Sequence, residues 1–258
     1  MVTVLGKGQV KMKELQAHDK VYTGTKLSEP FYQEVYSFVH WQDHISMEYI
    51  QVYYSKAYGT PLELSPSHLI FSGSKETVPI PASMIQAGDA LLLDKDGIQE
   101  EVTVTKVKIV TKEGAYLPLT SDGTIVVNDV VASAYVSIHD SAPKIVDWFG
   151  GIGIAEQTLF HWWLAPYRMV CTGMAPQLCT DDYNEEGIIH WLAFGEKLAV
   201  LGEKMPALVQ WIGLTLVLAL LGFLVVAEAV RVKPMTICLM VASLVAWDRM
   251  KKSLPGKK

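Results

Sequence analysis

The residues best suited to chemistry lie in the stretch LELSPSHLIF, residues 62–71, where a hydroxyl stands three positions before an imidazole. Ser65 and His68 are separated by a Pro-Ser pair, which favours a turn between two strands. One interpretation is that the hydroxyl and the imidazole are the remains of a catalytic pair. The alternative is a core histidine that is satisfied by backbone groups.

Two further histidines, His40 and His44, stand four residues apart in the stretch FVHWQDH. On a helix this spacing could bind a metal ion, but the context predicts a strand, in which four residues span about 13 Å. No metal site is therefore predicted, and no pattern indicates a cofactor. The sequence also shows no nucleophile, base and orienting group of the kind found in conventional proteases.

Three cysteines occur in the chain, Cys171, Cys179 and Cys238. The first two flank the stretch TGMAPQL, a loop with Gly and Pro that a disulfide could close in an oxidising compartment. Two free, buried thiols are the equally weighted alternative. None of the three cysteines lies near Ser65 and His68 in the sequence.

Strands must position these candidates, because residues 1–140 have the pattern of an all-β domain. Runs rich in β-branched and aromatic residues, such as VTVL, EVYSFVHW and EVTVTKVKIV, alternate with Gly, Pro, Asp and Asn. No helical period competes over this range.

An internal repeat divides this all-β region into two halves. The stretch LQAHDKV at 15–21 matches IQAGDAL at 85–91, an offset of 70 residues, and each copy is followed by two long predicted strands. The repeat predicts a pseudo-twofold β fold. Asp19 and Asp89, at equivalent corners, are predicted to accept hydrogen bonds from backbone amides in turns.

Residues 141–204 predict a mostly helical segment. The stretch AEQTLFHWWLAPYRMV suggests a helix that breaks before Pro166. An acidic loop and a second helix are predicted over residues 181–204. The apolar face of that second helix would comprise Ile188, Leu192, Phe194, Leu198 and Leu201. His161 and Arg168 are expected to tie this segment to the β domain.

A transmembrane helix is predicted over residues 205–230. It contains ALVQWIGLTLVLALLGFLVVA at 207–227, which is 21 residues without a charge and matches the thickness of a hydrocarbon core. A second apolar run at 234–247 has 14 residues, which is short for a span, and could lie in the interface or complete a tight hairpin. If it also spans, both ends of the chain share one side of the membrane.

The charge is distributed unevenly along the chain. The basic tail, residues 231–258, carries seven basic residues and one acid, so the overall charge of −5 leaves residues 1–230 at −11. An acidic body excludes nucleic acid as a partner, whereas a basic tail beside apolar sequence predicts a lipid bilayer. A single span then places the tail in the cytosol and the β domain in the lumen or outside the cell.

Four ordered blocks resemble the Hint fold of hedgehog-type autoprocessing domains and inteins. They are GQVKMKELQAHDKV, LELSPSHLIF with Ser65 in the place of the family's Thr, VPIPASMIQAGDALLL, and GTIVVNDVVASAYVSI. The stretch FHWWLAPYRMVC is similar to a segment found downstream of the Hint domain in many hedgehog-type members. The resemblance covers residues 2–170, and its pseudo-twofold fold agrees with the internal repeat.

The resemblance implies self-cleavage from an upstream segment in cis. In the family, an N-terminal Cys attacks the preceding carbonyl to form a thioester, and a sterol, another residue or water then releases the upstream segment. His68 would donate a proton to the leaving amide nitrogen, and the Ser65 hydroxyl would hold the scissile backbone. His40 falls near the hedgehog Asp that activates the sterol and could act as a base, with Asp43 as a less favoured replacement. The sterol acceptor itself is not carried over.

Two departures from the family separate two classes of function. No Cys precedes VTV, and Ala134 replaces the Cys of the fourth block. Either the sequence begins just past a cleavage site or it is a degenerate copy. The first case predicts a self-cleaving, cysteine-type enzyme whose nucleophile lies upstream of Met1. The second predicts a non-catalytic, membrane-anchored Hint-like module that binds or displays a partner.

Overall fold

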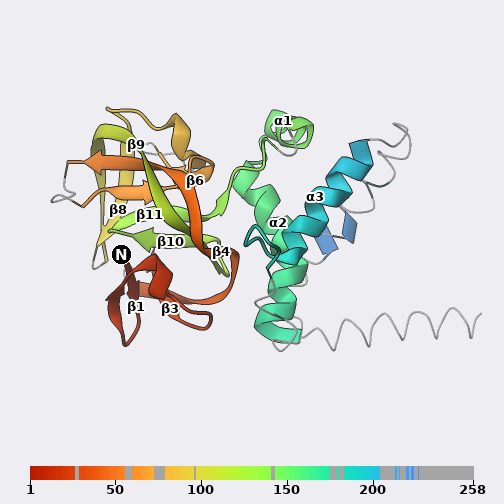
Figure 1. Ribbon diagram of the computed structural model, residues 1–258, viewed down its shortest axis with the longest axis horizontal. Coiled ribbons are helices and arrows are strands. Elements are labelled where there is room, and N and C mark those ends of the chain that lie inside the picture. Colours follow the sequence, from red (N-terminus) through yellow and green to blue (C-terminus); the bar gives the residue numbers. More distant parts are fainter. Residues whose placement is uncertain are drawn as a thin grey trace, which may run out of the picture.

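The computed structural model describes residues 1–26, 29–55, 60–72, 79–95, 97–140, 143–174, 179 and 183–203, together with positions 213, 215, 219, 220, 222, 223 and 226. Within these residues, the strands come first in the chain and the helices follow. The strand body and the three labelled helices lie beside each other (Figure 1).

The strand body is dominated by two long strands. These are β4 (Glu29–Tyr54) and β9 (Ile98–Thr120), which pair antiparallel along most of their length. The shorter strands are β1 (Val2–Val4), β2 (Gly8–Val10), β3 (Lys20–Lys26), β5 (Leu62–Leu64), β6 (His68–Phe71), β7 (Pro79–Pro81), β8 (Ala90–Lys95), β10 (Thr124–Val127) and β11 (Val130–Val136). Short 3₁₀ helices η1 (Met12–Glu14) and η2 (Ala82–Met84) stand before β3 and β8.

The strands form one antiparallel sheet that closes on itself. The order is β10-β1-β3-β4-β9-β8-β11-β6-β7, with β2 on β1, β5 on β4, and a further pairing between β10 and β11. The pairing of β10 with β11 closes the part of this order that runs from β10 through β1, β3, β4, β9 and β8 to β11. The closed part of the sheet encloses a core. The prediction of a predominantly β fold is confirmed.

The internal repeat is visible as two equivalent corners. The Gln16 amide donates to Asp19 Oδ2 at 3.1 Å, and the Gln86 amide donates to Asp89 Oδ2 at 2.7 Å. The carbonyl of each Asp accepts a hydrogen bond at 2.8 Å from the following long strand. The predicted turn role of both aspartates and the predicted pseudo-twofold arrangement are therefore confirmed.

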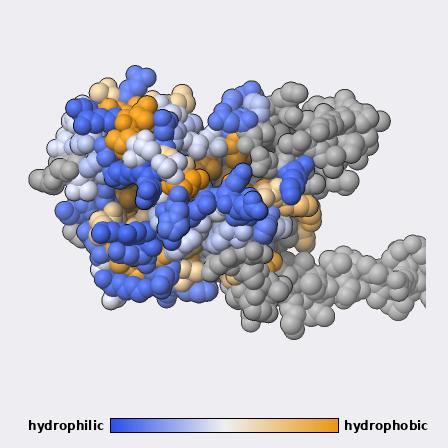
Figure 2. Space-filling model, in the orientation of Figure 1, coloured by the Kyte–Doolittle hydropathy of each residue, from blue (hydrophilic) through white to orange (hydrophobic). Residues whose placement is uncertain are grey.

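Three clusters of buried apolar side chains hold the described elements together, and two of them are large. The larger lies within the strand body, and the second joins the strands to α2. Members of the second cluster include Tyr36, Val39, Leu69, Leu119, Tyr135, Phe160 and Leu164. Burial of such side chains is the main favourable contribution to folding. On the outside, Figure 2 shows a largely hydrophilic strand body with small hydrophobic patches.

The helical segment comprises α1 (Pro143–Gly151), α2 (Glu156–Met169), a π-helical turn (Val170–Met174) and α3 (His190–Glu203). The predicted break before Pro166 is wrong, because α2 continues through it. Pro166 has no amide to donate to the preceding turn. Burial of Leu159, Phe160 and Leu164 on the same helix offsets this loss, and the helix widens only after Met169.

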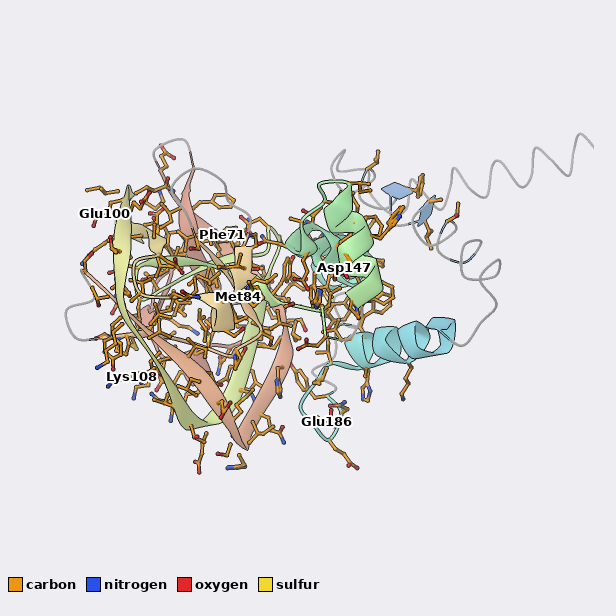
Figure 3. All side chains as sticks on the ribbon, turned by 90° about the horizontal axis from the view of Figure 1, so that it is seen from above. Phe71, Met84, Glu100, Lys108, Asp147 and Glu186 are labelled. Carbon is orange, nitrogen blue, oxygen red and sulfur yellow. A yellow bond between two sulfur atoms is a disulfide. The ribbon has the colours of Figure 1, made fainter. Side chains whose placement is uncertain are left out.

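The predicted apolar face of the second helix also needs correction. Ile188 lies before α3, where it forms an isolated bridge with His40 of β4. Phe194 is on α3 but is 53% exposed. The helix starts late because residues 183–189 form a tight hairpin, in which Tyr183 bridges Ile189. Figure 3 labels the exposed Glu186 on this hairpin.

The predicted transmembrane helix at 205–230 and the apolar run at 234–247 lie outside the described residues, apart from the seven separate positions between 213 and 226. In the part of the chain that the structure describes, no helix combines the length and the apolar character needed to cross a membrane.

Candidate functional site

Ser65 and His68 form a tight turn between β5 and β6. The His68 amide donates to the Ser65 carbonyl at 3.0 Å. The turn is held from both sides, because the Ser83 amide donates to the Pro66 carbonyl at 2.9 Å and the Ser137 amide donates to the Ser67 carbonyl at 2.7 Å. The predicted turn is thus observed, and η2 and the end of β11 fix it in place.

The imidazole of His68 is held by the neighbouring strand β11. His68 Nε2 lies 2.8 Å from the carbonyl oxygen of Ser133. A carbonyl can only accept a hydrogen bond, so Nε2 must carry the proton and Nδ1 keeps its lone pair. Burial lowers the pKa of His68 to about 4 and outweighs the Ser133 hydrogen bond, which raises it. At neutral pH the ring is therefore uncharged and able to accept a proton.

The described residues beside His68 on its own turn and on β11 offer serine hydroxyls and no thiol. The Ser65 side chain is partly exposed, and its hydroxyl makes no hydrogen bond to any residue that the structure describes. Ala134, which follows Ser133 on β11, is fully buried. The hydroxyl of Ser133 accepts the Tyr135 amide at 3.0 Å, which stiffens the strand that carries the His68 partner.

His40 lies on β4 beneath the hairpin at 183–189. The Trp41 amide donates to the Gly187 carbonyl at 2.9 Å, and the Ile189 amide donates to the Val39 carbonyl at 3.0 Å. His40 Nε2 is buried and has no hydrogen-bond partner among the described residues. The backbone on either side of His40 is thus hydrogen-bonded to this hairpin, whereas the backbones of Ser65 and His68 are hydrogen-bonded to each other.

The remaining candidates near His40 do not form a metal site. No group of three or more His, Cys, Asp or Glu side chains suited to a metal ion occurs within the described ranges. Asp43 instead accepts a hydrogen bond from the hydroxyl of Tyr116.

Asn128 is a residue that the sequence analysis missed. It forms, with Asp129, the two-residue turn between β10 and β11, and both have positive φ angles of 49° and 67°. Its side-chain oxygen accepts a hydrogen bond from the Met1 nitrogen, and its amide donates to the Met1 carbonyl at 2.9 Å. An Asn-Asp pair between two apolar runs is a hairpin signal that could have identified the turn.

Helix α2 braces β11 at two places. His161 Nδ1 lies 2.7 Å from the Tyr135 hydroxyl, and Glu156 accepts hydrogen bonds from the Ser137 hydroxyl and the Ile138 amide. The expected role of His161 as a tie to the β domain is confirmed. Arg168 is fully buried on the same helix and contacts the His161 carbonyl at 3.3 Å.

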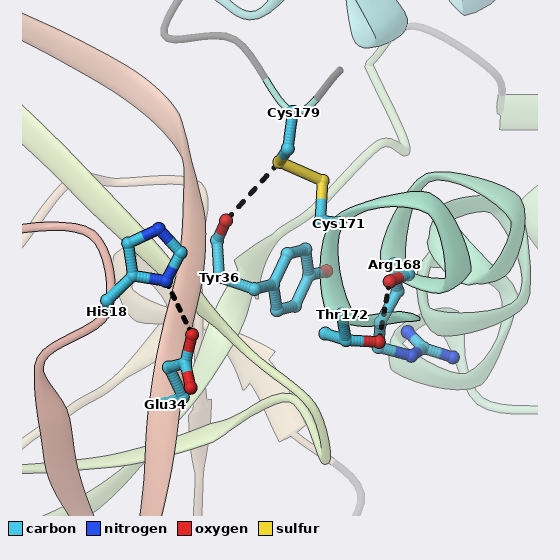
Figure 4. A network of polar contacts seen from close by, with 7 residues as sticks. All are labelled: His18, Glu34, Tyr36, Arg168, Cys171, Thr172 and Cys179. Carbon is cyan, nitrogen blue, oxygen red and sulfur yellow. Dashed lines mark hydrogen bonds and ion pairs between the residues drawn. A yellow bond between two sulfur atoms is a disulfide. The ribbon is translucent and has the colours of Figure 1, made fainter. Parts of the chain in front are cut away.

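A disulfide connects Cys171 and Cys179, with their Cα atoms 4.9 Å apart, which decides between the two alternatives left open by the sequence. Cys179 Sγ lies 3.4 Å from the carbonyl oxygen of Tyr36 on β4 (Figure 4). The disulfide therefore holds the chain beside the sheet shortly before the hairpin at 183–189. Burial raises the pKa of the Tyr36 hydroxyl well above its ordinary value.

Comparison with known sequences links the strand body to one family. The sequence model described as Hint module matches residues 1–149. The chain is 27% identical over 197 residues to Tiggy-winkle hedgehog protein of Danio rerio, covering 72% of this chain and 43% of that protein. It is 30% identical over 177 residues to Protein hedgehog of Drosophila ananassae, covering 66% and 34% respectively. The chain thus spans well under half the length of these relatives.

Solved structures with a similar arrangement include inteins. The crystal structure of gp41-1 intein superposes with a TM-score of 0.39 at 17% identity, covering 51% of this chain and 91% of that one. The solution structure of a bacterial intein-like domain from Clostridium thermocellum gives a TM-score of 0.41 at 19% identity, covering 51% and 93%.

Proposed function

The chain belongs to the Hint module family, and we propose that it is built for autoprocessing, in which a cysteine upstream of Met1 releases the segment before it in cis. The observation that carries this proposal is the arrangement of Ser65 and His68. A neutral, half-buried imidazole with a fixed proton on Nε2 stands beside a hydroxyl that has no partner within the described chain.

The first step is an N-to-S acyl shift. The cysteine sulfur adds to the carbonyl carbon of the preceding residue, and its proton passes to Nδ1 of His68. The same proton then moves to the amide nitrogen as the C–N bond breaks, which leaves a thioester and a free amine. This order refines the expectation that His68 simply donates, because a ring with a pKa of about 4 must first accept the proton.

Ser65 is proposed to hold the scissile backbone. Its hydroxyl can donate to the carbonyl oxygen on which negative charge develops, or accept from the amide at the cleavage site. The neighbouring carbonyls of Ser65, Pro66 and Ser67 are already engaged, so the turn is rigid before any substrate segment arrives. Such preorganisation lowers the cost of aligning the reacting groups.

The second step is cleavage of the thioester by another nucleophile. Water is sufficient in this proposal, and a sterol has no support from the described residues. The predicted role of His40 as a base for this step stays a prediction. It requires the acceptor to reach a ring that the hairpin at 183–189 covers.

Membrane attachment through residues 205–230 is a further part of the proposal, with the strand body lumenal or extracellular and the basic tail cytosolic. It is supported by the uncharged run at 207–227 and the basic residues after it. Carbonate extraction of membranes and protease protection of tags at the two ends would test insertion and orientation separately.

The second candidate function is a non-catalytic binding or display module. The observations in its favour are that Ala134 stands in the place of the Cys of the family's fourth block, and that Cys171 is bonded to Cys179. In that case the turn at Ser65 and His68 would be a retained structural element without a reaction to support.

A reporter fusion decides between these functions. A reporter fused before a cysteine that stands four residues ahead of Met1 of the full chain should be released by hydroxylamine, which cleaves the thioester and leaves the cysteine on the chain. His68→Ala should slow release by at least about 100-fold, and Ser65→Ala by about tenfold, whereas Ser65→Thr keeps the hydroxyl and most of the rate. His18→Ala, a change at an exposed histidine, is the matched control. Release that is unaffected by His68→Ala rejects the assignment of His68, and no release from the parent fusion favours the non-catalytic module.

A further inference from the structure

Asn128 is held in place by every polar group that it has. Its Nδ2 donates to the Pro61 carbonyl at 2.9 Å, and its carbonyl accepts the Tyr54 hydroxyl at 2.6 Å. Its remaining two groups, the side-chain oxygen and the amide, both bind Met1. Met1 is thus held by two hydrogen bonds to Asn128, one from its nitrogen to the Asn128 side chain and one to its carbonyl from the Asn128 amide.

The direction of β1 determines where any upstream residues start. β1 runs antiparallel to β10, with Val2 opposite Val127, so the chain arrives at the turn end of the β10–β11 hairpin. The imidazole of His68 contacts the same hairpin at Ser133. With a strand rise of about 3.3 Å per residue, the four steps from Asp129 to Ser133 cover about 13 Å.

The chain upstream of Met1 must therefore run back along the β10–β11 hairpin for its nucleophile to reach His68. The chain approaches Met1 from beyond the turn, so it has to reverse direction close to Asn128. Because an extended chain spans at most about 3.4 Å per residue, the return of about 13 Å needs roughly four residues between the reversal and the nucleophile.

We propose that Asn128 is a positioning residue for autoprocessing, which anchors Met1 as the pivot about which the upstream chain turns back towards Ser65 and His68. The inference rests on the proposed function. Asn128 never touches the reacting atoms; it acts through Met1. In a longer chain the nitrogen of residue 1 is an amide, whose single N–H can make the same hydrogen bond to Oδ1.

The substitution Asn128→Gly tests the role of the side chain without changing the backbone of the turn. The φ angle of 49° suits Asn and Gly, so Asn128→Gly keeps the backbone geometry and removes the side-chain clamp. Asp129→Gly is the matched control, because it changes the other residue of the same turn. Its carbonyl still accepts the Asp94 amide at 2.8 Å, and what is lost is the exposed contact with Lys95 and the charge of the carboxylate near Met1.

The test uses the full chain with the reporter and cysteine fused upstream. At saturating hydroxylamine, Asn128→Gly should slow release by about tenfold, while the hydroxylamine concentration for half-maximal rate stays unchanged. Asp129→Gly should remain within about twofold of the parent. Asn128→Asp, which keeps an acceptor oxygen for Met1, should recover most of the loss. Melting temperatures of all variants identify any loss that comes from unfolding.

The spacing of the cysteine provides a second readout. Cysteine placed directly before Met1 should give no release, whereas cysteine placed four residues before Met1 should give full release. Equal rates for the two spacings overturn the reversal at Asn128, and an unchanged rate in Asn128→Gly overturns its positioning role. In both of these cases the parent fusion still cleaves, so autoprocessing stands. Failure of the parent fusion at every spacing rejects autoprocessing and the positioning role together.

Discussion

The two halves of the strand body place the same corner at residues 16–19 and 86–89, but they differ in the strand that follows. In the first half, β3 contains Gly24 with a φ angle of +123° and a shift of register between Tyr22 and Gly24. In the second half the equivalent position, 70 residues later, is Asp94, which is fully buried. The comparison shows that the repeated residues set the geometry of the two corners. Side chains that occur in only one copy, such as Asp94, pack between the two copies.

Asp94 fits because Gly24 has no side chain. A Cβ atom added at Gly24 would lie 3.4 Å from Asp94 Oδ2. The carboxylate accepts hydrogen bonds from the Tyr22 hydroxyl and, at 2.8 Å, from Gln99 Nε2. A buried carboxylate is tolerated only when such donors compensate for the loss of water. The two copies are thus complementary at this point.

The largest expected effect comes from removing this complementarity. Asp94→Ala should lower the free energy of unfolding by about 3 kcal/mol, because it deletes the buried acceptor of the buried Tyr22 hydroxyl and of the Gln99 side chain. Urea unfolding measures the change, and Asp89→Ala serves as a comparison at a half-buried carboxylate of the same half. A loss below about 1 kcal/mol would show that water or another group replaces the carboxylate.

The second expected effect concerns pH, since His68 belongs to the first half only and the position 70 residues later is Ile138. The pKa of His68 is about 4 in the folded chain and about 6.5 in the unfolded chain. Above pH 6.5 the imidazole is therefore mostly uncharged in both states. Below pH 6.5 the unfolded chain binds the extra proton, and stability falls until about pH 4, by up to about 3 kcal/mol. His68→Gln should remove this part of the pH dependence in urea titrations at pH 7 and pH 4.5. An identical pH dependence in the variant would place the ring in a more hydrated site.

The smallest effect distinguishes the two corners themselves. Asp19 is buried and also contacts Lys7 Nζ at 2.5 Å, whereas Asp89 is half-buried. Asp19→Ala should therefore cost about 2 kcal/mol and Asp89→Ala about 1 kcal/mol, although both remove the same turn hydrogen bond. Thermal unfolding of the two variants measures the difference. Equal losses would mean that Lys7 contributes nothing beyond the turn.

The sequence predicted those features that depend on local pattern. The repeat, the turn aspartates and the turn at Ser65 and His68 follow from short-range signals, and the structure confirms their geometry. The partners of His68 and Met1 were not predictable, because Ser133 and Asn128 are far away in sequence and meet them only through strand pairing. The predicted helix break before Pro166 was wrong for a related reason. Burial of one face of α2 outweighs the local preference of proline for ending a helix.

The hairpin at residues 183–189 also protects the sheet from other chains. It occupies a stretch of β4 near Val39 and Trp41 that β9 pairs on only one side. An open strand edge is a template for pairing with a second molecule, and the matched Hint module ends at residue 149, before this cover. A chain shortened to that module would present those backbone groups to its neighbours, whereas in the longer chain the hairpin at 183–189 pairs with them.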